Sequence, residues 1–243
     1  MRGEYKNNLI GKNIYCSMII GYELKEFMEG FPIKVILIHG FNKNSKDMRK
    51  LKRNLESLGY ECFSPNLQLT YKEIEHAAFV LEGILKEITF NLKENERIHL
   101  VGHSTGGLVI RKLIVNTKYI EKIGRCVLIA TPNNGSKLAT IAGSMRVFVE
   151  LYKTLKSLSY ESVRQLHLEN DPKIEMAAIA GNKNNLWLGS LIGDENDGRV
   201  EVESVYFPHL KDFLVLPYGH KEIHHQAETA KRVDAFLRTG KLE

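Results

Sequence analysis

The sequence predicts an α/β fold with a mostly parallel central sheet that helices cover on both faces. Short apolar runs alternate along the chain with longer segments whose apolar residues recur at helical spacing. The runs are continuously apolar, as in strands buried on both faces, and ligands bind such sheets at the carboxyl ends of the strands. We expect strands at 34–38, 61–64, 98–101, 126–130, 176–180 and 213–216. We expect helices at 45–58, 73–92, 105–116 and 222–237.

Length and composition describe an ordinary globular chain. Its 243 residues suit a single domain over 1–243. The formal net charge of +5 is a mild bias that is compatible with an anionic surface or substrate, but we favour an ordinary solvated surface. Lys and Arg are scattered among acids, unlike the basic stripe of a nucleic-acid-binding protein. Cys16, Cys62 and Cys126 form neither a disulfide framework nor a zinc spacing, which points to a reducing compartment. With no secretory signal or bilayer-length apolar segment visible, we expect a cytoplasmic protein.

A nucleophilic serine is predicted between the strand at 98–101 and the helix that follows. Gly102-His103-Ser104-Thr105-Gly106 matches G-x-S-x-G, in which a tight strand-to-helix turn exposes the serine hydroxyl. The turn leaves no room for side chains at the flanking positions, so glycines occupy them. The pattern alone occurs by chance in ordinary turns, but here it follows an apolar strand and opens an amphipathic helix. We therefore predict that Ser104 is the nucleophile.

An oxyanion hole is predicted from the loop after the first strand. His39-Gly40-Phe41 follows that strand directly. In this arrangement one backbone N–H comes from the residue after the nucleophile, Thr105, and another from an earlier loop. We assign the second donor to Phe41 and expect His39 to have a structural role.

The acid and the base are predicted downstream of the serine. The loop from Gly193 to Val200 holds Asp194 and Asp197, and we favour Asp197 because a turn glycine and an apolar residue follow it. A solvated acidic loop is the alternative; a calcium loop lacks the required spacing. His220 follows a predicted strand and turn and is our general base. We expect His224 and His225 to lie on the helix surface and predict no metal site, because no H-E-x-x-H pattern accompanies the His220 and His224 spacing.

Taken together, these motifs resemble the lipase and GPI inositol-deacylase-like branch of the α/β-hydrolases. The resemblance covers Lys34 to Leu237 and leaves out the first 30 residues. It implies the α/β-hydrolase fold, a Ser104–Asp197–His220 triad and a pocket-shaping loop at 131–136. Where many such lipases have further glycines after His-Gly-Phe, this chain departs from the pattern with Asn42-Lys43-Asn44. Four stretches carry the resemblance: His39-Gly40-Phe41, Gly102 to Gly107, Ala130 to Ser136, and the Asp197-Gly198 loop followed by Gly219-His220.

A helical cap insertion is predicted at about 137–171. Apolar residues recur there at helical spacing, a pattern typical of core packing and also of a lid over an acyl pocket. We name His103, Phe148 and Trp187 as candidate substrate contacts; Trp187 either lines the cleft or is simply buried. The stripe consists of Ile141, Met145, Phe148, Tyr152, Leu155 and Leu158.

The predicted activity is hydrolysis of carboxylic esters through an acyl-enzyme on Ser104, with no cofactor. The expected partner is a small acyl ester, with no nucleic acid, and transient contact with a membrane or lipid surface is compatible with the sequence. A thioesterase, deacylase or acyltransferase would use the same triad. A catalytically silent protein of the same fold that only binds a ligand is the alternative from another class.

Overall fold

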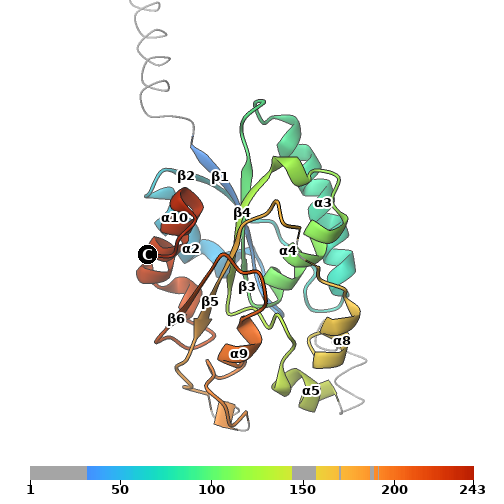
Figure 1. Cartoon of the computed structure of the whole chain (residues 1–243), viewed down its shortest axis with the longest axis vertical. Helices are drawn as coiled ribbons and strands as arrows, with labels where there is room; N and C mark the ends of the chain where they lie inside the picture. Colours follow the sequence, from blue (N-terminus) through green and yellow to red (C-terminus); the bar gives the residue numbers. More distant parts are fainter. Residues whose placement is uncertain (1–31, 144–156, 170, 187–188, 191) are drawn as a thin grey trace, which may run out of the picture. The chain divides into compact units, whose positions relative to one another are not determined.

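The computed structural model describes residues 32–143, 157–169, 171–186, 189–190 and 192–243. Their centre is a six-stranded sheet, entirely parallel, in the order β2-β1-β3-β4-β5-β6 (Figure 1). This arrangement confirms the predicted fold class and all six predicted strands, with ends shifted by three residues at most. The strands are β1 (Ile33–Ile38), β2 (Tyr60–Phe63), β3 (Ile98–His103), β4 (Ile123–Ile129), β5 (Met176–Gly181) and β6 (Asp212–Leu216).

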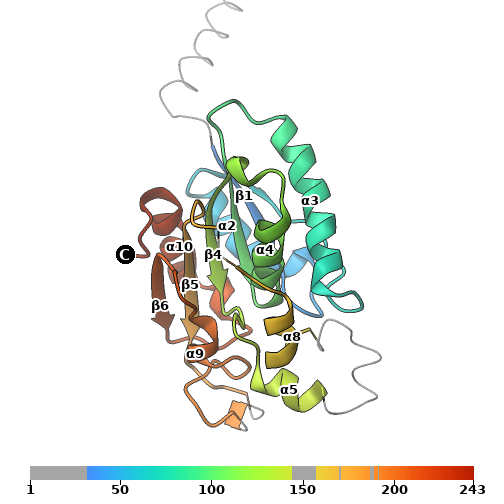
Figure 2. The same ribbon diagram turned by 45° about the vertical axis from the view of Figure 1, so that its right-hand side comes forward.

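Helices cover both faces of the sheet, with α3 and α4 on one side and α2 and α10 on the other (Figures 1 and 2). Ile36 of β1 packs in the cluster that includes α3 and α4, whereas Leu37 packs in the cluster that includes α2 and α10. Because alternate residues enter opposite cores, every position from Val35 to Ile38 is apolar and buried. The longer helices are α2 (Arg49–Glu56), α3 (Ile74–Phe90), α4 (Thr105–Asn116) and α10 (Ala227–Thr239).

Shorter helices lie in the loops between these elements. Two of them, α5 and α8, lie within the predicted cap at 137–171, whereas residues 144–156 lie outside the described part of the chain. The cap remains a prediction. The short elements are η1 (Ser45–Met48), η2 (Ile120–Lys122), α5 (Lys137–Gly143), α8 (Tyr160–Gln165), α9 (Val202–Val205) and η4 (Ile223–His225).

Two predicted helices differ from those observed. The helix expected at 45–58 starts as the 3-10 turn η1, and its N-cap is Asn44 rather than Ser45, because the Asn44 side chain accepts a hydrogen bond from the Lys46 N–H at 2.9 Å. The helix expected at 222–237 is broken at Gln226, whose extended backbone separates η4 from α10. Among the described residues, no helix combines the length and apolar character needed to cross a bilayer.

The sheet register brings the functional loops together. Ile38 of β1 lies beside Gly102 of β3, and His103 of β3 lies beside Ile129 of β4. The carboxyl ends of these parallel strands therefore meet at one edge, as expected for the ligand-binding edge of an α/β sheet.

Candidate active site

Ser104 occupies a strained turn between β3 and α4. Its φ of 54° and ψ of −125° are rare for a residue with a side chain. A Cβ on Gly102 would lie 2.5 Å from the Gly107 nitrogen, and one on Gly106 would overlap the Ile38 carbonyl oxygen. The backbone segments therefore approach too closely for side chains at the two flanking positions, which is the reason for glycine that the sequence pattern suggested.

The three predicted triad residues lie in one chain of contacts. His220 Nε2 is 3.0 Å from Ser104 Oγ, and His220 Nδ1 is 2.7 Å from Asp197 Oδ2. Because a carboxylate at this site accepts a hydrogen bond, Nδ1 carries the proton and Nε2 presents its lone pair to the serine hydroxyl. All three residues are buried, and Ser104 is 8% exposed. This order of contacts is the one that activates a serine.

The loop between β5 and α9 holds the Asp197 carboxylate through backbone hydrogen bonds. Asp197 Oδ1 accepts hydrogen bonds from the Arg199 N–H at 3.0 Å and the Val200 N–H at 2.8 Å. The His220 N–H donates to the Asp197 carbonyl at 2.9 Å, so main chain and side chains tie acid and base together. Asp194, the alternative acid, is exposed and lines a different cavity. Among the two aspartates of this loop, the structure places Asp197 on His220.

The loop after β1 lies directly beside the serine. A Cβ on Gly40 would be 3.0 Å from Ser104 Cβ, so this glycine permits the close approach. Gly40 and Phe41 line the same small cavity as Ser104 and His220. Thr105 is the first residue of α4, where a backbone N–H has no acceptor within the helix. Both predicted oxyanion donors therefore belong to residues adjoining the serine.

His39 is tied to the backbone on both sides of its ring. Nε2 accepts from the Leu67 N–H at 3.1 Å, and Nδ1 donates to the Gly40 carbonyl at 2.9 Å. Burial lowers the pKa of His39, although these bonds and Asp47 oppose the shift. The side chain thus supports the loop that carries Phe41, in line with the predicted structural role.

Behind the triad lies a second histidine–carboxylate pair that the sequence prediction missed. His224 Nε2 is 3.1 Å from Asp47 Oδ2, and His225 Nε2 is 3.0 Å from the Asp47 carbonyl. The expectation that His224 and His225 lie on a helix surface is wrong for His224, which is 1% exposed and stacks on His103 with ring centroids 3.7 Å apart. The expectation fails because η4 turns inward toward η1, a contact between elements far apart in the chain.

His103, a candidate substrate contact, lies within the protein at the edge of the site. Its Nε2 donates to the His220 carbonyl at 3.0 Å, and its ring is 4% exposed while still lining the serine cavity. Burial holds the pKa of His103 well below its usual value, and the neighbouring His224 and His220 lower it further. The ring is neutral near pH 7 and helps to position the loop of the base.

One group of side chains in the described part of the chain is close enough together to hold a metal ion. It consists of Asp47, His224 and His225, whose ligand atoms all lie within 4.8 Å of one another. These atoms already make the hydrogen bonds given above. Desolvation raises the pKa of Asp47, but the bond from His224 and the charges of Lys43 and His225 outweigh it, so the net shift is downward. Desolvation lowers the pKa of His224 to about 4.

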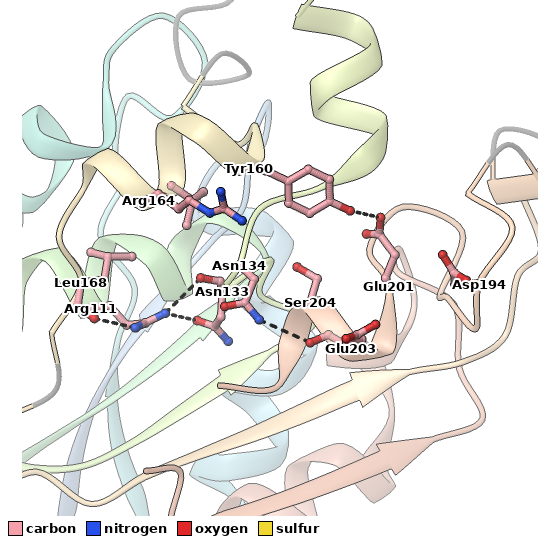
Figure 3. Close-up of a pocket in the computed structure, with 11 residues that line it drawn as sticks. Arg111, Asn133, Asn134, Tyr160, Arg164, Leu168, Asp194, Glu201, Glu203 and Ser204 are labelled. Atoms are coloured by element: carbon pink, nitrogen blue, oxygen red, sulfur yellow. Dashed lines mark hydrogen bonds between the residues drawn. The ribbon is translucent and has the colours of Figure 1, made fainter. Parts of the chain in front are cut away.

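A cavity of about 460 Å³, larger than the one that Ser104 lines, lies near the carboxyl end of β4 (Figure 3). None of Ser104, Asp197 and His220 lines it. Arg111 donates there to the Asn133 carbonyl and side chain at 3.2 Å and to the Leu168 carbonyl at 2.6 Å. Opposite, the Tyr160 hydroxyl donates to Glu201 at 2.7 Å. The 131–136 loop, expected to shape the substrate pocket, thus lines this cavity through Asn133 and Asn134.

The two remaining candidate contacts, Phe148 and Trp187, lie outside the described residues. Of the predicted apolar stripe, the Leu158 side chain is described; it is 7% exposed and packs in the core with α3 and α4. Three cationic residues beside the serine, Lys43, Arg199 and Lys221, were not singled out from the sequence. Their positions one or two residues after Phe41, Asp197 and His220 were the available signal.

Solved structures of hydrolases have the same fold. The mature form of the lipase BlEst2 from Bacillus licheniformis matches with a TM-score of 0.74 and 20% identity, covering 87% of this chain and 93% of that one. The metagenomic carboxyl esterase MGS0156 matches with a TM-score of 0.64 and 18% identity, covering 79% of this chain and 65% of that one. Phospholipase PlaB from Legionella pneumophila matches with a TM-score of 0.60 and 18% identity. The match covers 78% of this chain and 53% of that one, so this chain spans about half of that protein.

A family model described as "Putative serine esterase (DUF676)" matches residues 34–169, more than half of the 243 residues. The match includes β1 from its second residue onward, the Phe41 loop and the Ser104 turn. The chain belongs to this serine esterase family and is a carboxylesterase- or lipase-like hydrolase of the α/β-hydrolase fold.

Proposed function

We propose that the protein hydrolyses carboxylic esters through an acyl-enzyme on Ser104, with Asp197 and His220 completing the triad. The observation that carries this proposal is the continuous contact from Ser104 Oγ through both nitrogens of His220 to Asp197 Oδ2, at 3.0 and 2.7 Å. A general base within hydrogen-bond reach of a hydroxyl, itself oriented by a buried carboxylate, is the arrangement that nucleophilic catalysis requires.

In the acylation step, the Ser104 oxygen bonds to the ester carbonyl carbon while His220 Nε2 takes the hydroxyl proton. The carbonyl oxygen becomes an oxyanion facing the N–H groups of Phe41 and Thr105. Each such donor contributes about 3–4 kcal/mol to transition-state stabilisation. The carbon–oxygen bond to the alcohol then breaks, and His220 gives its proton to the departing alcohol.

In the deacylation step, a water molecule replaces the alcohol. His220 Nε2 takes a proton from this water as its oxygen bonds to the acyl carbon, and the proton returns to Ser104 as the acid leaves. Asp197 stabilises the imidazolium in both steps without itself becoming protonated. Its two backbone hydrogen bonds keep the carboxylate in place throughout.

The substrates we propose are small acyl esters. The similar structures are named as a lipase, a carboxyl esterase and a phospholipase, which supports an acyl ester for this chain. We also propose that the domain extends over 1–243 with a cap at 137–171, of which α5 and α8 are described. Contact with a lipid surface is compatible with such substrates.

Labelling with a fluorophosphonate tests the activated serine. We expect an adduct on Ser104, located by mass spectrometry of the digested protein, and none on Ser104→Ala. A matched control is Ser136→Ala: Ser136 is another buried serine, and its hydroxyl donates to the Arg199 carbonyl at 3.0 Å. An unlabelled, folded wild-type protein would count against an activated serine and favour a ligand-binding role.

Turnover assays separate the hydrolase from the alternatives that share its triad. Hydrolysis of butyrate esters that is lost in Ser104→Ala is the expected result. Faster turnover of the matching acyl thioester, or transfer of the acyl group to an added alcohol in preference to water, would instead indicate a thioesterase or an acyltransferase.

A further inference from the structure

We propose that Lys43, Arg199 and Lys221 select esters that carry an anionic group, a carboxylate or a phosphate, close to the scissile bond. This inference rests on the proposed function and adds a substrate class to it.

The cavity that holds the catalytic serine has an unbalanced charge. Nine residues line it; three of these are the cations named above, and none is Asp or Glu. The volume is about 10 Å³, room for about one water molecule. A group on the substrate that extends beyond the reacting carbonyl therefore lies outside this cavity, at whose edge Lys43 and Lys221 are exposed.

The three cations belong to the loops that carry the proposed catalytic residues. Lys43 lies two residues after Phe41, Arg199 two residues after Asp197, and Lys221 directly after His220. The backbone of Arg199 is also bonded to the proposed acid, because the Arg199 backbone N–H donates to Asp197 Oδ1 at 3.0 Å. Three separate loops thus present positive charge to one point.

Nearby carboxylates neutralise this charge only in part. Asp197 is engaged by His220 and by two backbone N–H groups. Asp47 lies 3.6 Å from the Lys43 ammonium and accepts from His224. In the described part of the chain, neither Arg199 nor Lys221 forms an ion pair through its side chain.

Arg199 differs in this respect from three other arginines of the chain. Arg125, Arg232 and Arg238 each contact a carboxylate at 2.6–2.7 Å. Arg199 is half-buried, and this desolvation lowers the pKa of its guanidinium although Asp197 and Asp47 attract the charge. Partial burial of an unpaired cation is unfavourable, and a bound anion reverses that cost. A substrate anion beside Ser104 would supply the missing partner.

The test compares two esters that differ by one charge. The butyrate esters of 4-hydroxybenzoate and 4-hydroxybenzamide have nearly the same shape, and only the first is anionic. We expect kcat/KM to favour the anionic ester by about tenfold at low salt, and the preference to shrink at 0.5 M NaCl as screening increases. Butyrylglycerol phosphate compared with butyrylglycerol distinguishes a phosphate from a carboxylate preference.

Variants then assign the preference to residues. Arg199→Gln is expected to lower the anionic-to-neutral ratio about five- to tenfold, Lys221→Gln about two- to threefold, and Arg199→Lys much less than Arg199→Gln. Lys231→Gln, on the exposed face of α10, is the matched control and should leave the ratio unchanged. Because both esters are assayed on one preparation, the folded fraction cancels from each ratio.

The outcomes separate this inference from the proposed function. The inference about anion selection is overturned if the wild type has nearly equal kcat/KM for the anionic and the neutral ester. It is also overturned if Arg199→Gln and Lys221→Gln leave the ratio of these two kcat/KM values unchanged. In either case Ser104-dependent hydrolysis of both esters still supports the proposed function. Hydrolysis of neither ester by folded, full-length protein overturns the proposed function and the inference with it.

Discussion

The described residues include two buried histidine–carboxylate pairs whose histidines, His220 and His224, are four residues apart, and of these two histidines His220 contacts Ser104. His220 contacts Asp197 at 2.7 Å, and His224 contacts Asp47 at 3.1 Å. Both imidazole rings are almost completely buried. The second nitrogen of His220 is 3.0 Å from Ser104 Oγ, whereas Nδ1 of His224 is buried without a hydrogen-bond partner among the described residues.

The two pairs thus differ in what the histidine contacts, and our proposal assigns catalysis to the pair that contacts Ser104. The His224 pair connects η1 to η4, and its ring stacks on His103, the residue before Ser104. His103 in turn donates to the His220 carbonyl. We interpret the second pair as a structural support for the loops of the first, which leads to opposite expectations for the two pairs.

Removal of the base from the first pair should have the largest effect. We expect His220→Asn to lower kcat/KM for a butyrate ester by about 10⁶-fold, because the serine hydroxyl then has no proton acceptor. Steady-state assays alongside Ser104→Ala measure this. A double variant that is no slower than either single one would show that the two residues act as a unit; losses that multiply would contradict the triad.

Replacement of the acid should have the next largest effect. Asp197→Asn keeps the shape of the side chain but donates to His220 Nδ1, which reverses the tautomer and should cost about 10⁴-fold in kcat. Asp194→Asn is the matched control in the same loop and should change kcat by less than about twofold. If Asp194→Asn lowered kcat more than Asp197→Asn did, the acid of the triad would be Asp194.

The sequence was sufficient to predict the first pair but not the second. The strand–turn–helix around Ser104 is specified locally, since its apolar run, glycines and amphipathic helix are contiguous. Asp197 and His220 each follow a recognisable turn near the carboxyl edge of the sheet. Asp47 and His224, by contrast, are 177 residues apart and belong to polar segments that resemble surface helices. Their contact depends on how η1 and η4 fold against the sheet.

The same distinction applies to the secondary structure. The six strands were predictable because the sheet lies between two layers of helices, which makes most of their residues apolar. The 3-10 turns η1 and η4 were not predictable, because the Asn44 cap and the extended Gln226 that define them depend on single local contacts. The second pair joins these two elements.

Replacement of His224 should have a smaller effect, and on stability more than on catalysis. His224→Phe keeps a flat ring against His103 but removes the bond to Asp47. We expect kcat to fall by less than about tenfold and the free energy of unfolding at pH 8 to fall by about 1–3 kcal/mol. Urea unfolding followed by circular dichroism measures the second quantity. His76→Gln, on the exposed face of α3, should change it by less than about 0.5 kcal/mol.

The destabilisation by His224→Phe should also depend on pH. The pKa of His224 is lowered from 6.5 to about 4 in the folded protein, chiefly by desolvation and against the hydrogen bond to Asp47. Below about pH 6.5 the unfolded chain binds a proton at this residue that the folded chain does not, so the wild type loses about 1.4 kcal/mol per pH unit that the variant does not lose. Burial of neutral His224 thus contributes fully above pH 6.5, and the two proteins should converge in stability as the pH falls toward 5. A difference that stays constant from pH 8 to 5 would mean that folding leaves the pKa of His224 unshifted. A difference that grows as the pH falls from 8 would mean that the folded protein holds His224 charged in an ion pair with Asp47, and either result would contradict the neutral support inferred above.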